Sequence, residues 1–217
     1  MVAPSPSFPR DQARRILDAG LEAMALEPVS ADRRSLLLDY LGQLAQWNRV
    51  HNLTAVRDPL EMVSHHLLDS LSLLPWVPGG EVCDIGSGAG LPGLPLAICR
   101  PDQTFTLVEP TGKRAAFLRS VVAGLGLSRV RIIQSRSEAY RPAAYPAAVI
   151  SRAVASLAEL DLMTQHLQGP ATLCLALKGP RAADEIAAWP RAAELQVTVQ
   201  NLQVPGLPPR VLVGWQA

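Results

Sequence analysis

The sequence has few cysteines, few charged residues and no long hydrophobic run. Three cysteines occur in 217 residues, and Cys83, Cys99 and Cys174 show no Cys-x-x-Cys spacing. An odd number of cysteines without paired spacing argues against a disulfide scaffold and against a zinc module. No apolar run reaches the ~18 residues of a membrane span, and the opening MVAPSPSFPR lacks the charged-then-apolar order of a secretion signal. We therefore expect a cytoplasmic protein with no membrane contact and no metal.

The positive and negative charges of the chain nearly cancel. Lys and Arg number 20 and Asp and Glu number 19, which gives a net charge of +1. A nearly neutral chain neither indicates nor excludes a nucleic-acid partner, so any phosphate-binding surface has to be local. With 48% apolar residues the chain is too hydrophobic to be disordered, and its length suffices for one sizeable domain.

The first third of the chain has helical periodicity. Residues 1–10 are rich in Pro and Ser and are expected to form a disordered tail, because they offer little apolar surface to offset the entropy of ordering. Residues 11–78 are expected to form a helical extension, in which Ser30 and Asp58 are the N-caps of the second and third helices. The apolar spacing predicts helices over 11–26, 31–47 and 59–74.

From residue 79 to residue 217, short β-type runs alternate with helix-length segments. This alternation predicts right-handed crossovers, a mostly parallel sheet covered by helices on both faces, and a ligand site at the carboxyl ends of the strands. The last two runs are joined by a short Pro/Gly segment, which predicts an antiparallel hairpin. The expected strands cover 81–85, 104–108, 130–134, 147–151, 171–177, 194–204 and 210–215.

The first of these strands ends in a glycine-rich loop. Gly86, Gly88, Gly90 and Gly93 permit positive φ and let a ligand approach the backbone N–H groups. Gly88-x-Gly90-x-x-Gly93 also matches the dinucleotide fingerprint, which would indicate a nicotinamide-dependent oxidoreductase, and a turn without a ligand is the ordinary alternative. However, Asp84 would repel a pyrophosphate, whereas it can receive a cationic amino group directly or through water. This favours S-adenosylmethionine.

Polar residues follow the next strands at the same edge. Glu109 ends the second strand, where its two oxygens can accept from the ribose hydroxyls of adenosine, although a solvated carboxylate is the alternative. The segment 135–138 follows the third strand and can meet the adenine edge. Lys178, together with Arg136, Arg152 and Arg181, can form a local phosphate-binding edge, and Lys113 can contact an RNA phosphate. Each of these side chains can equally face solvent.

The segment 150–156, after the fourth strand, faces the transferable group in this architecture. It has neither the Asn/Asp-Pro-Pro-aromatic segment of enzymes that methylate exocyclic amines nor the nucleophilic Cys of pyrimidine C5 enzymes. A ring nitrogen with a free lone pair, such as guanine N7, needs neither. Proximity, alignment and stabilisation of the product would then carry the catalysis.

An ordered set of motifs resembles the glucose-inhibited division protein B family, whose members are bacterial 16S ribosomal RNA guanine-N7 methyltransferases. The motifs are Asn52-Leu53-Thr54-Ala55, His66-Leu67-Leu68-Asp69-Ser70, Asp84-Ile85-Gly86-Ser87-Gly88-Ala89-Gly90-Leu91-Pro92-Gly93, Gly112-Lys113-Arg114, Ser151-Arg152-Ala153 and Ala176-Leu177-Lys178-Gly179.

The resemblance extends from about Tyr40 to Asp184 and implies both a fold and a reaction. The implied fold is a Rossmann-like class I S-adenosylmethionine-dependent methyltransferase with an N-terminal helical extension. The implied reaction is methyl transfer from S-adenosylmethionine to N7 of a guanine in 16S ribosomal RNA or the 30S subunit, by direct in-line attack without a covalent enzyme intermediate. S-Adenosylhomocysteine is the product, and we expect a monomer.

The resemblance also implies site residues. Glu109 departs from the Asp-Ser that is usual in the family, and Pro110 removes a backbone N–H from that loop. Cofactor binding is expected of Asp84, Gly86, Ser87, Gly88, Gly90, Leu91, Glu109, Ser137, Glu138 and Arg152. Catalytic roles are expected of Arg152, Ser151 and Lys178. RNA contacts are expected of Lys113, Arg114, Arg136 and Lys178.

Three alternatives stay open from the residues alone. A small-molecule methyltransferase is compatible with the weak net charge. A nicotinamide-dependent oxidoreductase rests on the glycine fingerprint alone, because neither Lys113 nor Lys178 has a Tyr four residues before it. A catalytically silent RNA-binding protein could use the same fold as a scaffold and would show no cofactor affinity.

Overall fold

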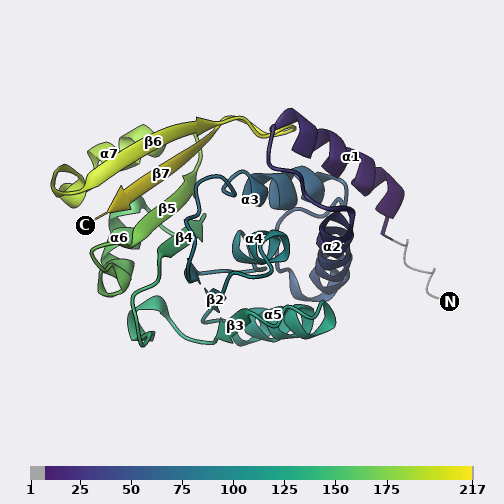
Figure 1. Ribbon diagram of the computed structural model, residues 1–217, viewed down its shortest axis with the longest axis horizontal. Helices are drawn as coiled ribbons and strands as arrows, with labels where there is room; N and C mark the ends of the chain where they lie inside the picture. The colour runs from purple at the N-terminus through teal and green to yellow at the C-terminus, as the bar shows by residue number, and fades with distance from the viewer. Residues whose placement is uncertain (1–7, 217) are drawn as a thin grey trace.

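The computed structural model describes residues 8–216, and its centre is one sheet of seven strands (Figure 1). The sheet has the order β3-β2-β1-β4-β5-β7-β6; β1 to β5 run parallel, and β7 runs antiparallel to both of its neighbours. This confirms the predicted α/β architecture with an antiparallel C-terminal hairpin. The strands are β1 (Val82–Ile85), β2 (Phe105–Val108), β3 (Val130–Ile133), β4 (Ala148–Arg152), β5 (Leu173–Lys178), β6 (Gln196–Leu202) and β7 (Arg210–Gln216).

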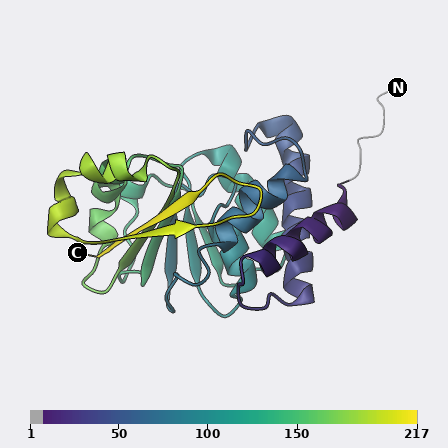
Figure 2. The ribbon, with the colours of Figure 1, turned by 90° about the horizontal axis from the view of Figure 1, so that it is seen from above.

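Helices cover both faces of the sheet (Figure 2). Alternate strand residues point to opposite faces, so Phe105 and Leu107 join one core cluster and Val108 joins the other. The first cluster includes side chains of α1 (Arg10–Ala23), α2 (Ala31–His51), α4 (Gly93–Cys99) and α5 (Gly112–Gly124). The second includes side chains of α6 (Leu157–Thr164) and α7 (Ala182–Ala187). Short 3-10 turns, η2 (Ser137–Ala139), η3 (Gln165–Leu167) and η4 (Pro190–Glu194), complete the connections.

The two first helices form as their sequence patterns predict. Ser30 Oγ accepts a hydrogen bond from Arg33 N at the start of α2, which continues to His51, four residues beyond the expected end. The end of the N-terminal tail differs from the expectation of disorder. Phe8 packs against the first core cluster, and α1 begins at Arg10. Residues 1–7 of the expected tail lie outside the described residues.

The third helix differs from the expectation. Instead of a regular α-helix over 59–74, the chain forms a π-helical segment, η1 (Val63–Leu68), that continues into the short α3 (Asp69–Leu71). Asp58 Oδ1 accepts from Leu60 N at 2.8 Å, so the N-cap bond closes one residue earlier than in a capping box. A π segment widens the turn and changes the direction in which the following side chains point. Such segments are frequent at functional sites.

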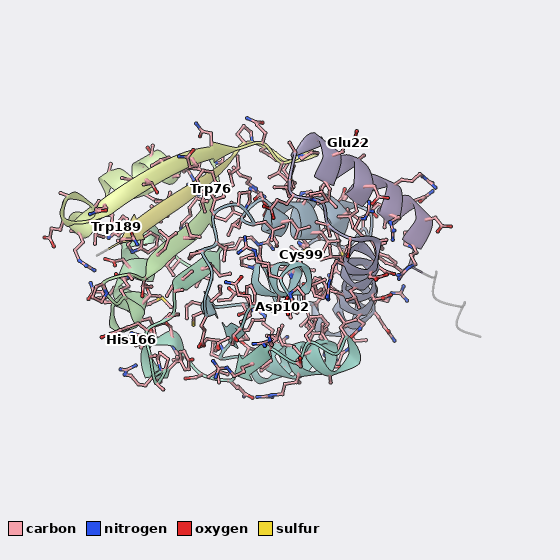
Figure 3. All side chains as sticks on the ribbon, in the orientation of Figure 1. Glu22, Trp76, Cys99, Asp102, His166 and Trp189 are labelled. Atoms are coloured by element: carbon pink, nitrogen blue, oxygen red, sulfur yellow. The ribbon has the colours of Figure 1, made fainter. Side chains whose placement is uncertain are left out.

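The C-terminal hairpin packs over α6 and α7 through two tryptophans. Trp189, labelled in Figure 3, meets Trp215 of β7 edge to face, with ring centroids 5.1 Å apart. Its indole Nε1 donates to Asp161 Oδ2, and Arg191 also binds this carboxylate. The hairpin is therefore anchored firmly to the rest of the sheet. Within residues 8–216, no helix combines the length and the apolarity that a membrane crossing requires.

Candidate active site

The glycine loop after β1 is shaped by close backbone contacts. Gly86 has φ of +67°, and a Cβ at this position would lie 2.7 Å from Val154 Cγ2. A Cβ at Gly93 would lie 2.6 Å from Asp84 Oδ2. Any side chain at either position would displace its neighbour, so the sequence needs glycine here for close approach as well as for conformation.

Asp84 anchors this loop from beneath. Its side chain is fully buried, and Oδ2 accepts from Gly93 N at 3.0 Å. Ser87 Oγ donates to the Asp84 carbonyl at 2.9 Å, which fixes the turn. Burial raises the pKa of the Asp84 carboxyl to about 7, against the lowering by the hydrogen bonds from Gly93 and Ser87. Asp84 Oδ1 has no hydrogen-bond partner within the described part of the chain, so it can accept from a donor that the protein does not supply.

Glu109 lies beside the same loop, at the tip of β2. Its Oε2 accepts from Gly88 N at 2.9 Å and its Oε1 accepts from Thr111 N at 2.8 Å. The side chain is buried, so these bonds hold both carboxylate oxygens against the glycine loop. Pro110 has no N–H to give, and Thr111 supplies the bond instead. A carboxylate oxygen has two acceptor positions, so a pair of ribose hydroxyls can still bind here.

Three other residues predicted to bind the cofactor have different surroundings. Leu91 is buried and precedes the cis peptide bond to Pro92. Ser137 is buried, and its Oγ donates to the Met163 carbonyl, which ties η2 to α6. Glu138 is exposed. Ser137 and Glu138 follow β3, so their backbone lies at the carboxyl edge beside β2.

These features fit the cofactor that the sequence predicts. At Gly88 a Cβ would meet only the Gly86 carbonyl, at 3.8 Å, so the glycine loop, which we call the glycine cradle, leaves its backbone open to a ligand there. Asp84 offers a buried acceptor oxygen, and Glu109 offers a carboxylate beside Gly88. A cationic amino group suits the first carboxylate and a diol suits the second.

A cleft of about 840 Å³ lies at the carboxyl ends of β4 and β5, next to the glycine loop. Val154 joins the two, because it lines the cleft and meets Gly86. The cleft, which we call the strand-end cleft, is lined in part by His65, His66, Asp69, residues 152–156, Lys178, Arg181, Asp184, Glu185 and Arg210. It has the size of an ordinary ligand pocket.

Two arginines and one buried carboxylate form one wall of the strand-end cleft. Arg152 Nη1 donates to Asp69 Oδ2 at 2.7 Å and to the His65 carbonyl at 2.6 Å. Arg210 Nε donates to the other oxygen of Asp69 at 2.8 Å. Asp69 is 2% exposed in its side chain, whereas Arg152 and Arg210 are 16% and 24% exposed. The carboxylate thus holds both guanidinium groups at the cleft while other N–H donors stay available.

His66 lies next to this pair and is neutral. Its Nε2 is 3.0 Å from Thr54 Oγ1, and burial lowers its pKa to about 4. Asn48 holds the Thr54 segment in turn, because its side chain accepts from Thr54 N and donates to the Val56 carbonyl. Thr54 of the Asn52-Leu53-Thr54-Ala55 motif is therefore held beside His66 on this side of the cleft.

Lys178 and Ser151 were predicted to be catalytic, and both side chains are engaged within the protein. Lys178 Nζ donates to the Ala155 carbonyl and pairs with Glu185 Oε2 at 2.7 Å, and its side chain is 8% exposed. Ser151 is buried and its Oγ donates to the Ile85 carbonyl at 3.2 Å. Lys178 lines the strand-end cleft, so it contributes charge there while it supports the loop after β4.

The other predicted RNA-binding residues lie outside the cleft lining. Lys113 and Arg114 belong to the first turn of α5, and Arg136 precedes η2. Lys113 and Arg136 are exposed, whereas Arg114 is half-buried. Asp69, Arg210 and Asp184 were not predicted to be site residues. Asp69 lies in the His66-Leu67-Leu68-Asp69-Ser70 motif, and no local pattern identifies the other two.

The fold is that of the class I methyltransferases. Similar folds occur in magnesium protoporphyrin IX methyltransferase from Synechocystis, solved with bound S-adenosylmethionine, with a TM-score of 0.58, 15% identity and coverage of 88% of this chain and 100% of that chain. The tRNA methyltransferase TrmK of B. subtilis has a TM-score of 0.57 and 16% identity, over 69% of this chain and 65% of that chain. At such identities the likeness concerns the fold alone.

Comparison of sequences identifies the family. The family described as rRNA small subunit methyltransferase G (GidB) matches residues 33–211. Curated relatives named ribosomal RNA small subunit methyltransferase G include those of Methylobacillus flagellatus, 44% identical over 88% of this chain and 91% of the relative, and of Xanthomonas euvesicatoria, 46% identical over 88% of each. The chain therefore belongs to the rRNA small subunit methyltransferase G family, which confirms the resemblance seen in its motifs.

Proposed function

We propose that this chain transfers a methyl group from S-adenosylmethionine to N7 of a guanine in 16S ribosomal RNA of the small subunit. The observation that carries the proposal is the contact between two sites at one edge of the sheet. A glycine cradle with two buried carboxylates meets, at Val154, a cleft lined by charged side chains of both signs. Family membership supports ribosomal RNA as the substrate.

The cradle would hold the cofactor through its backbone. Gly86, Gly88 and Leu91 would contact it along the loop, Asp84 would receive its amino group, and Glu109 would receive the ribose hydroxyls. When bound, S-adenosylmethionine supplies an electrophilic methyl group on a sulfonium. Backbone groups after β3, at residues 135–138, would meet the adenine edge. Arg152 would stand at the boundary between cofactor and target.

The strand-end cleft would hold the target base. Guanine N7 has a free lone pair, so the cleft needs to orient the base and exclude water but needs no proton acceptor. A cysteine nucleophile is also unnecessary, and burial raises the pKa of both Cys83 and Cys174. Direct attack without a covalent enzyme intermediate is the mechanism that suits these residues, with S-adenosylhomocysteine as the product. Arg152 and Lys178 would fix the geometry of the loop that covers the base.

Further parts of the proposal concern the assembly. We expect Lys113, Arg114 and Arg136 to contact RNA phosphates at the rim, with 16S ribosomal RNA or the 30S subunit as the partner. We expect the protein to act as a monomer in the cytoplasm. Residues 79–217 would form the methyltransferase domain and 11–78 its helical extension, packed as one unit; Tyr40 Oη, for example, donates to the Ala89 carbonyl of the glycine loop.

The test is methyl transfer from labelled S-adenosylmethionine to 30S subunits and to naked 16S RNA, both from a strain without the homologous enzyme. The modified nucleoside is identified by mass spectrometry. Label in 7-methylguanosine supports the proposal. Label in another nucleoside, or no label from a preparation that binds the cofactor, contradicts it.

A further inference from the structure

The strand-end cleft contains three carboxylates, and two of them hold cations of the cleft wall. Asp69 receives Arg152 on one oxygen and Arg210 on the other. Glu185 Oε2 pairs with Lys178 and also accepts from Leu157 N at 3.0 Å. A ligand that drew either carboxylate away would leave a buried or half-buried cation without its partner, so neither group is free to move toward a ligand.

Asp184 is the third carboxylate, and its side chain is free. It lies on α7, is exposed, lines the same cleft, and has no side-chain hydrogen bond or ion pair to any residue from 8 to 216. The helix that carries it is nevertheless held in place. Ala182 is buried beneath α7, and the adjacent Glu185 ties the helix to Lys178 and to the start of α6. The cleft thus presents one carboxylate, on a helix that is held in place, whose oxygens make no bond to residues 8–216.

On the basis of the proposed function, we infer that Asp184 is a specificity-determining residue that reads the Watson–Crick edge of the target guanine. Guanine carries two donors side by side on this edge, N1–H and the N2 amino group, and a carboxylate accepts both in parallel. Adenine presents a lone pair at N1, which a carboxylate repels. Cytosine presents a lone pair at N3, and uracil flanks its single donor with two carbonyl oxygens. A carboxylate at this place therefore selects guanine both by attraction and by repulsion.

The same carboxylate favours the reaction itself. Methylation at N7 converts a neutral guanine into a cation, with no proton lost to balance the new charge. The positive charge spreads over the ring and makes N1–H a stronger donor, so its bond to Asp184 strengthens as the methyl group arrives. An interaction that is stronger in the transition state than in the ground state raises the rate. Arg152 and Arg210 would oppose this charge, and Asp69 neutralises part of their own.

The test compares Asp184→Asn with Asp102→Asn in single-turnover methyl transfer to 30S subunits. Asp102, labelled in Figure 3, is also exposed but precedes β2, at the amino end of the strands. We expect Asp184→Asn to lower the single-turnover rate constant about 10- to 100-fold, because the amide loses the charge and presents a donor to N1–H. The Kd for S-adenosylmethionine and the melting temperature should stay at wild-type values, and Asp102→Asn should change nothing. Asp184→Glu, which keeps the carboxylate, should recover part of the loss.

A second measurement places the contact on the base. Inosine lacks the N2 amino group, so an RNA with inosine at the methylated position, mapped from the wild-type product, should react about 10-fold more slowly than the guanosine RNA with wild-type enzyme. With Asp184→Asn the two RNAs should react alike. Full activity of Asp184→Asn, or an undiminished preference for guanosine in that variant, overturns the inference. Absence of 7-methylguanosine with wild-type enzyme would instead overturn the proposed function.

Discussion

The carboxyl edge of the sheet has two halves that are built in different ways. Beside β1 and β2 the site consists mainly of backbone, with glycines in close contact and two buried carboxylates bound to N–H groups. Beside β4 and β5 the site consists of long charged side chains, in which Arg152, Arg210 and Lys178 are each held by an acid. Backbone geometry tolerates little variation, whereas a cleft lined by side chains can be reshaped by single substitutions. The first half suits a constant cofactor, and the second suits a particular base.

A substitution that fills the glycine cradle is the most damaging change we expect. In Gly86→Asp the side chain meets Val154 at a positive φ and adds a charge beside Asp84. We expect the affinity for S-adenosylmethionine in calorimetric titration to fall at least ~100-fold, about 2.7 kcal/mol. Gly79→Asp is the matched control, because nothing lies within 4 Å of a Cβ there. Unchanged affinity in Gly86→Asp would place the cofactor elsewhere.

Loss of the shared carboxylate should disturb the cleft and the fold together. Asp69→Asn leaves Arg152 and Arg210 facing one another without a counter-charge, which should lower the free energy of unfolding by about 3 kcal/mol in urea. Asp39→Asn removes an exposed ion pair with Arg10, both groups being 43% exposed, and should cost less than about 1 kcal/mol. Equal stability of the two variants would mean that Asp69 is no buried anchor.

The sequence predicts the half of the site beside β1 and β2 better than the half beside β4 and β5. The glycine loop, Asp84 and Glu109 lie in short segments whose spacing is specific, and the strands occur within one or two residues of the predicted ranges. The π-helical segment η1 has no signal in the apolar periodicity, which looks like an ordinary helix. The contact between Asp69 and Arg210 joins residues 141 positions apart, so no local pattern could reveal it. Tertiary packing decides both.

A change of pH should affect the half beside β1 and β2 through Asp84, with a smaller effect than the substitutions above. Because burial raises the pKa of Asp84 to about 7, the folded protein keeps this proton where the unfolded chain has lost it. The contribution of Asp84 to stability is therefore full below about pH 4 and is lost as pH rises towards 7. A cationic amino group needs the ionised carboxylate, so affinity for S-adenosylmethionine should rise about 5-fold between pH 6 and pH 7, below the pH of about 8 at which an α-amino group loses its own charge. Titrations of Asp84→Asn over the same range should give a flat profile; a persistent slope would assign the titration to another group.

The smallest effect should come from substitution of an exposed basic residue at the carboxyl edge of the sheet, outside the strand-end cleft. Lys113 is exposed on α5, so Lys113→Ala should weaken RNA binding only about 2- to 5-fold and reduce the slope of log K against log salt by about one. The exposed Arg129, which follows α5 at the amino end of β3, is the control position for Arg129→Ala. Filter binding over a range of salt concentrations measures both. Equal effects at the two positions would show that RNA does not prefer the carboxyl edge.

The central claim is that the two halves perform separate tasks at one edge. It is tested most directly by measuring the Kd for S-adenosylmethionine and the single-turnover rate of methyl transfer, side by side, in Gly86→Asp and Arg210→Ala. We predict that Gly86→Asp loses cofactor affinity. Arg210→Ala removes one of the two partners of Asp69 and so disturbs the cleft wall that orients the base, and this cost should exceed any gain from removing a positive charge. We therefore expect it to keep the wild-type Kd within about twofold and to lose at least ~10-fold in rate. A parallel loss of affinity and rate in Arg210→Ala would contradict the claim, because it would show that the cleft and the cradle bind the same ligand.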